Sequence, residues 1–166
     1  LQLEDIVFDV EVVKDWVDAG EQDVYVGETA AVATADELKA AINDPEVTAV
    51  VLTDNIDLGS TTITRAEDEA VVVDKQYFTI DGNGKTLTYN GSTRVIDFVK
   101  GNVVKNATVK NLTINITSSY CERGINFNNA NGSLLIENVK FQGTAPTYAV
   151  NFPSVANGAD VTIKNS

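Results

Sequence analysis

Apolar and polar positions recur along the second half of the chain at a fixed interval of 27 residues. The residues that keep this interval are Leu87, Ile114 and Phe141 in an apolar register, and Asn111, Asn138 and Asn165 in a polar one. Such a period is typical of a solenoid, because each coil places its inward side chains on those of the coil below. The pattern predicts a parallel β-solenoid.

The same alignment predicts interior stacks and a turn. One stack holds Ile80, Val109, Ile136 and Ile163, and the other holds Ile96, Ile125 and Val150. The aligned turn residues, which we expect to form a structural ladder, are Gly82, Asn111, Asn138 and Asn165. Gly and Asn tolerate a left-handed backbone, and stacked Asn amides can bond to one another. We expect about four to five coils, which at a rise of roughly 4.8 Å per coil make a solenoid only about 20–25 Å long.

A short helix is expected before the first coil. Thr34 can cap its N-terminus while Glu37, three residues later, reaches back to the same turn. One apolar face follows, and Asn43-Asp44-Pro45 ends the element. Such a helix would cover the open end of a solenoid. The predicted fold is therefore all-β, a single-stranded right-handed parallel β-helix with a short N-terminal capping α-helix.

Residues 1–28 alternate in polarity but lie outside the 27-residue period. We interpret them as the terminal strand and linker of a preceding domain; a strand that lies along the solenoid is the alternative. Residues 29–166 then form the β-helix domain, and because the sequence stops within a coil, we expect this domain to be C-terminally truncated. The open strand edge at that end leaves self-association with another copy open.

Composition excludes several classes of partner. The formal net charge is −12 and the isoelectric point is about 4.2. No Lys/Arg cluster reverses this sign locally, so we expect no nucleic-acid partner. No apolar run approaches 18 residues, so we expect no membrane insertion by this segment. The chain has no histidine to activate a nucleophile, and we interpret its single cysteine, Cys121, as a small packed or turn residue.

Three segments of this chain resemble the pectate-lyase-like (pectin-lyase-like) superfamily of right-handed parallel β-helices, especially its adhesive members in bacterial surface proteins. They are Thr34 to Ile42, Val50 to Leu58 and Tyr77 to Leu87. Separately, Val10 to Asp18 resembles the closing strand of fimbrillin-like domains of Bacteroidetes surface lipoproteins. Together these resemblances imply an extracellular location at the bacterial cell surface, in a parent protein anchored to the outer membrane.

Candidate ligand-binding residues lie on neighbouring coils. Arg94 and Arg123 come just before two aligned strands and are suited to carboxylates. A polar stripe beside them consists of Asp97, Asn126 and Asn151. Three tyrosines near coil boundaries could stack on sugar rings, although we favour the interpretation that such a tyrosine fills a turn: Tyr89, Tyr120 and Tyr148. Of these, Tyr120 and Tyr148 precede corresponding strands and are kept as binding candidates. The resemblance implies acidic calcium ligands with an Arg or Lys base. The sequence shows no such acidic cluster around the arginines, so no catalytic residue is named.

We expect no cofactor, although the acidic groups leave calcium open. Asp54 and Asp57 form one such group, and Glu67, Asp68 and Glu69 form another. Residues 81–85 resemble the start of a calcium loop, but we interpret them as a tight turn because no closing Glu follows.

The sequence favours a cell-surface binding or adhesion module, without catalytic activity of its own, that contacts a carbohydrate. Its partner would be a glycan or a host or cell-surface protein. One alternative is a fragment of a polysaccharide lyase or glycoside hydrolase, and another is a passive structural stalk. Unsaturated uronate products would distinguish the lyase.

Overall fold

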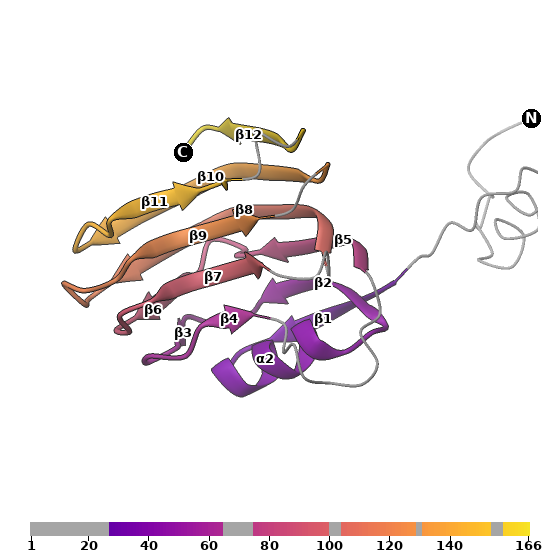
Figure 1. The fold of residues 1–166 in the computed structure, drawn as a ribbon. Coiled ribbons are helices and arrows are strands. Elements are labelled where there is room, and N and C mark those ends of the chain that lie inside the picture. Colours follow the sequence, from indigo (N-terminus) through magenta and orange to yellow (C-terminus); the bar gives the residue numbers. More distant parts are fainter. Residues whose placement is uncertain (1–26, 65–74, 100–103, 129–130, 154–157) are drawn as a thin grey trace, which may run out of the picture.

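The computed structural model describes residues 27–64, 75–99, 104–128, 131–153 and 158–166. Within these ranges the chain is mostly β, with parallel coils that stack from the N-terminal helix to the last strand (Figure 1). The strand predicted within residues 1–28 and the acidic group at residues 67–69 lie outside the described residues.

Two parallel sheets, which we name A and B, form the walls of the solenoid. Sheet A consists of β1 (Glu28–Val32), β2 (Val47–Leu52), β5 (Lys75–Asp81), β8 (Val104–Ile116), β10 (Ser133–Gly143) and β12 (Asp160–Lys164), with the short β3 (Ile56–Asp57) and β6 (Thr86–Tyr89) at its side. Sheet B consists of β4 (Ile63–Thr64), β7 (Arg94–Val99), β9 (Arg123–Asn128) and β11 (Tyr148–Asn151). Strands adjacent in a sheet come from successive coils, which confirms the predicted fold class.

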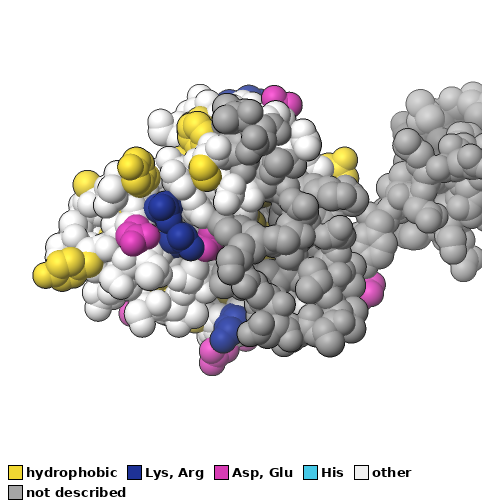
Figure 2. Space-filling model, viewed as in Figure 1, with side chains coloured by type: hydrophobic (Ala, Val, Ile, Leu, Met, Phe, Trp, Pro, Cys, Tyr) yellow, Lys and Arg dark blue, Asp and Glu magenta, His cyan; other side chains and the backbone are white. Residues whose placement is uncertain are grey.

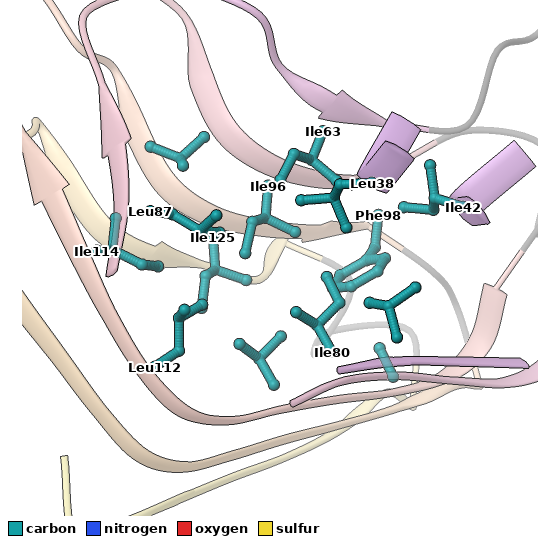
Figure 3. Packing of buried hydrophobic residues seen from close by; sticks show 14 of the residues in the cluster. Leu38, Ile42, Ile63, Ile80, Leu87, Ile96, Phe98, Leu112, Ile114 and Ile125 are labelled. Atoms are coloured by element: carbon teal, nitrogen blue, oxygen red, sulfur yellow. The ribbon is translucent and has the colours of Figure 1, made fainter. Parts of the chain in front are cut away.

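The predicted interior stacks are confirmed by the strand register. Ile80 pairs with Val109, which pairs with Ile136 and then Ile163. In sheet B, Ile63, Ile96, Ile125 and Val150 are aligned in the same way. Side chains from both sheets meet in one buried cluster (Figure 3). Burial of apolar surface between the sheets is therefore the main force that holds the coils.

The solenoid makes about three turns, fewer than the four to five expected. The aligned positions of sheet B mark these turns, since the chain returns from Ile63 to Ile96, then to Ile125 and Val150. Four aligned positions enclose three turns, so the expectation of four to five coils was too high.

The bend within sheet A depends on left-handed asparagines. Asn111, Asn138 and Asn165 have φ angles of 51°, 55° and 50°, a conformation that Asn adopts more readily than most residues. Gly82 lies at the aligned place with a different role: a Cβ there would come within 2.5 Å of the Asn111 carbonyl oxygen. Only glycine permits this close approach of two backbones.

Helix α2 (Ala35–Asn43) closes the N-terminal end of the solenoid. Its predicted capping box is present, because Glu37 N–H donates to Thr34 Oγ1 while the Glu37 carboxylate accepts from Thr34 N–H. The helix buries Leu38 and Ile42, which lie near Phe98 in the core (Figure 3). Strand β1, which we did not predict, precedes the helix and pairs with β2.

Candidate functional site: the outer face of sheet B

Two arginines and a tyrosine form a column at the start of three neighbouring strands. Arg94 pairs with Arg123, and Arg123 pairs with Tyr148, in a parallel register. We name these three residues the arginine column. The two arginines therefore belong to adjacent coils, whose strands are roughly 4.8 Å apart. Figure 2 shows two adjoining basic side chains flanked by acidic ones on this side of the molecule.

Each arginine has one acidic neighbour. Arg94 Nη1 lies 2.9 Å from Asp97 Oδ2, and Arg123 Nη1 lies 3.4 Å from Glu122 Oε2. The side chains of the two arginines remain 35% and 25% exposed. These ion pairs balance the local charge, but partly exposed pairs contribute little to stability.

The Nε–H groups of Arg94 and Arg123 are both buried and have no hydrogen-bond partner among the described residues. A buried donor without an acceptor costs roughly 1–3 kcal/mol. The same deficit on two adjacent coils is unusual, because most buried donors in folded proteins are satisfied. The arginine column therefore carries unused hydrogen-bonding capacity.

A second column, formed by Asp97, Asn126 and Asn151, lies beside the arginine column. These residues are in register. Asn126 Nδ2 donates to Asp97 Oδ1 at 2.8 Å, and Asn151 Nδ2 donates to Asn126 Oδ1. We name this set the sheet B amide ladder. Asp97 already accepts from both Arg94 and Asn126, so both of its carboxylate oxygens are engaged within the fold.

The central rung of the sheet B amide ladder is covered. Asn126 is only 3% exposed, although the alternation of the strand directs its side chain away from the apolar interior. Its two hydrogen bonds, to Asp97 and from Asn151, compensate for this burial. The ladder therefore fixes Asp97, and through it the position of the Arg94 guanidinium.

The tyrosines have different environments. Tyr148, at the end of the arginine column, is 52% exposed, and Tyr120, in the turn before β9, is 79% exposed. Tyr89 is fully buried, and its hydroxyl lies 3.1 Å from Thr93 Oγ1. The Tyr89 ring therefore fills the turn, as we expected of a tyrosine at a coil boundary.

The described acidic residues form no metal site. No group of three or more His, Cys, Asp or Glu side chains is arranged to hold a metal ion within the described ranges. Asp54 Oδ1 and Asp57 Oδ1 accept from the backbone N–H groups of Asn55 and Gly59. Asp81 Oδ1 accepts from Asn83 N–H and Asn111 Nδ2, which makes residues 81–85 a hydrogen-bonded turn.

Cys121 is buried beside the arginine column. Burial raises the pKa of its thiol above the ordinary value, and the negative charge of Glu122 acts in the same direction. The S–H group lies near the carbonyl oxygens of Thr93 and Arg123. A thiol with a raised pKa is a poor nucleophile at neutral pH.

Sequence reasoning missed two features of this face. It did not foresee Glu122 as the partner of Arg123, although the two are adjacent in the chain. It also grouped Tyr148 with Tyr120, whereas the register places Tyr148 with Arg123. The sequence did carry a signal for this pairing. Arg123 and Tyr148 are 25 residues apart, the same interval that separates the aligned residues Ile125 and Val150.

The stacked parallel coils define the protein as a β-solenoid domain with a polar outer face on sheet B. A family model described as "Putative pectate lyase-like adhesive domain" matches residues 29–165, and the chain belongs to this family. The description suggests adhesion to a surface partner and a place at the cell surface. No curated protein and no solved structure matches the chain. In the part of the chain that the structure describes, no helix is long and apolar enough to cross a membrane.

Proposed function

We propose that this domain is a non-catalytic adhesive module that binds a glycan at the bacterial cell surface through the outer face of sheet B. The observation that carries the proposal is the arginine column, in which two partly exposed guanidinium groups and the exposed ring of Tyr148 follow one another over three coils. Guanidinium donors suit sugar oxygens, and a tyrosine ring offers an apolar face to a pyranose.

Backbone hydrogen bonds beneath this face make it a rigid surface on which a ligand can bind. The N–H groups of Glu122 and Arg123 both donate to the Thr93 carbonyl oxygen, at 2.8 and 3.0 Å. Thr62 Oγ1 donates to the Arg94 carbonyl oxygen at 2.8 Å. Side chains held on a hydrogen-bonded sheet lose little entropy when a ligand binds, which favours affinity. The repeat of the coils also suits a polymer that presents similar groups at regular intervals.

The engaged carboxylates favour binding over catalysis. Glycoside hydrolysis needs two carboxyl groups free to act on either side of a sugar bond. On this face Asp97 is bonded to Arg94 and Asn126, and Glu122 is paired with Arg123. Lyase chemistry would need calcium to neutralise a uronate and a free base beside it. For these reasons we favour adhesion over the lyase and hydrolase alternatives.

A glycan array tests the proposal directly. We expect the protein to bind a defined subset of glycans, in calcium and in chelator alike, and we expect Arg94→Ala and Arg123→Ala each to weaken binding at least about tenfold. Lys140→Ala is the matched control, because Lys140 is an exposed basic residue of β10 in sheet A and its loss changes the net charge equally. Binding that all three variants retain would place the ligand elsewhere, and a blank array would contradict the proposed function.

A further inference from the structure

Both arginines of the column leave the same edge of the guanidinium group unused. The planar guanidinium can donate two parallel hydrogen bonds from its Nε/Nη2 edge to an oxyanion. In Arg94 and in Arg123 the acidic neighbour takes Nη1, and Nε–H has no partner among the described residues. We name the Nε/Nη2 edge of each arginine, whose buried Nε–H is unpartnered within the described ranges, the free fork.

The two free forks lie one coil apart on the same face. Arg94 and Arg123 are directly paired in the register of β7 and β9, so their Cα atoms are separated by the strand spacing of roughly 4.8 Å. Tyr148 occupies the next rung of the same column. The two Nε/Nη2 edges therefore belong to adjacent coils, with an aromatic residue on the third.

The local charge favours a ligand group with a single negative charge. Two arginines face two carboxylates, Asp97 and Glu122, so the four side chains sum to zero. The chain as a whole carries a formal charge of −12, which repels polyanions at long range. Recognition must therefore come from hydrogen-bond geometry at short range, and a doubly charged group would meet more repulsion than a singly charged one.

We propose that the two free forks together bind a sulfate ester carried by the glycan ligand. A sulfate ester has three terminal oxygens and one negative charge, so a single group can accept hydrogen bonds from both forks. A carboxylate has two oxygens in one plane and satisfies one fork. A phosphate monoester has three oxygens but carries nearly two charges at neutral pH. This inference rests on the proposed function, since it names the chemical group that the glycan presents to the arginine column.

The sheet B amide ladder has a positioning role in this arrangement. Asn126 Nδ2 holds Asp97 Oδ1, while Asp97 Oδ2 holds Arg94 Nη1. This chain of hydrogen bonds fixes the rotation of the Arg94 side chain and keeps its free fork in one orientation. A preorganised fork loses less conformational freedom on binding than a free lysine does.

Three polymers with the same backbone test the inference: dextran, carboxymethyl-dextran and dextran sulfate. We expect the intact protein to bind dextran sulfate at least about tenfold more tightly than either of the others, measured by calorimetry at physiological salt. Arg94→Lys and Arg123→Lys keep the charge but remove the fork. Each should weaken binding to dextran sulfate about tenfold, whereas Lys140→Gln, on sheet A, should change it less than about twofold. Thermal melts of all variants show that the fold is retained.

Each outcome has a definite meaning. Equal affinity for carboxymethyl-dextran and dextran sulfate overturns the sulfate assignment. So does undiminished binding to dextran sulfate by a variant that carries both Arg94→Lys and Arg123→Lys. Failure of dextran sulfate to bind overturns it as well. In all of these cases the proposed function survives if the glycan array gives hits that depend on Arg94 or Arg123. A blank array overturns both.

Discussion

Two amide ladders climb this solenoid, and both start from an aspartate. At the bend of sheet A, Asp81 accepts from Asn111, which accepts from Asn138. On the outer face of sheet B, Asp97 accepts from Asn126, which accepts from Asn151. The two ladders differ in the basic residue that forms an ion pair with the aspartate.

The basic partner decides what each ladder does. Asp81 pairs with Lys110, which belongs to the next coil, at 3.3 Å. Asp97 pairs with Arg94, which lies on the same strand three residues earlier. The first pair joins two coils, whereas the second holds an arginine whose buried Nε–H has no partner among the described residues. We infer that the Asp81–Lys110 pair at the foot of the sheet A ladder joins adjacent coils, and that the ladder of sheet B orients a binding group.

The largest expected effect comes from the core on which both ladders rest. Ile125 is fully buried under the sheet B amide ladder and lies among Ile96, Leu112 and Ile114 (Figure 3). Ile125→Ala should lower the free energy of unfolding by roughly 2–5 kcal/mol, because it removes buried methylene groups and leaves a cavity. Urea titration measures this loss. Ile163→Ala is the control; Ile163 is 49% exposed, and a change below about 1 kcal/mol is expected.

The second effect separates the two ladders. Asn126→Ala leaves Asp97 Oδ1 and Asn151 Nδ2 without their partner and should cost about 1–3 kcal/mol. Asn138→Gly removes the corresponding amide in sheet A, where the φ angle of 55° suits glycine. Because Asn138 is exposed, we expect that change to cost less than about 1 kcal/mol. Equal losses in urea titrations would contradict the distinction between a covered and an exposed ladder.

The periodic part of the fold could be predicted from the sequence. The 27-residue interval predicted that Leu87, Ile114 and Phe141 would align, and the register confirms it. Thr34 and Glu37 predicted the capping box of α2 in the same way. These predictions succeed because a repeated coil or a local cap leaves the same chemical pattern wherever it occurs.

The details of the ladders could not be predicted so well. Gly82 aligns with Asn111, but Asn111 Nδ2 donates to Asp81 Oδ1 instead, because glycine has no side chain that could accept the hydrogen bond. The alternation of side chains along the strand predicted that Asn126 points outward, but it could not predict that this side chain is buried. The burial of a side chain and its hydrogen-bond partner both depend on side chains from other coils. The 27-residue period gives the alignment of positions but not these contacts.

The smallest effect concerns pH and again compares the two aspartates. Burial alone would raise the pKa of Asp81, but hydrogen bonds from Asn83 N–H, Asn111 and Lys110 outweigh it, so the pKa lies below the ordinary value. Because the folded-state pKa is depressed, the ionised carboxylate contributes stability that is complete above the unfolded pKa. This contribution is lost as pH falls through the folded pKa, that is, below about pH 4.

Asp81→Asn should therefore flatten the decline of stability in acid, because an amide oxygen still accepts from Asn83 and Asn111 but does not titrate. Between about pH 5 and about pH 3, the urea midpoint of the variant should fall less than that of the parent protein. Asp54→Asn is the control, since Asp54 is exposed and its carboxylate accepts from the adjacent Asn55 N–H within the same turn. If both variants declined as steeply as the parent, the tie between Asp81 and the next coil would contribute nothing in solution. The contrast between the two ladders would then rest on sheet B alone.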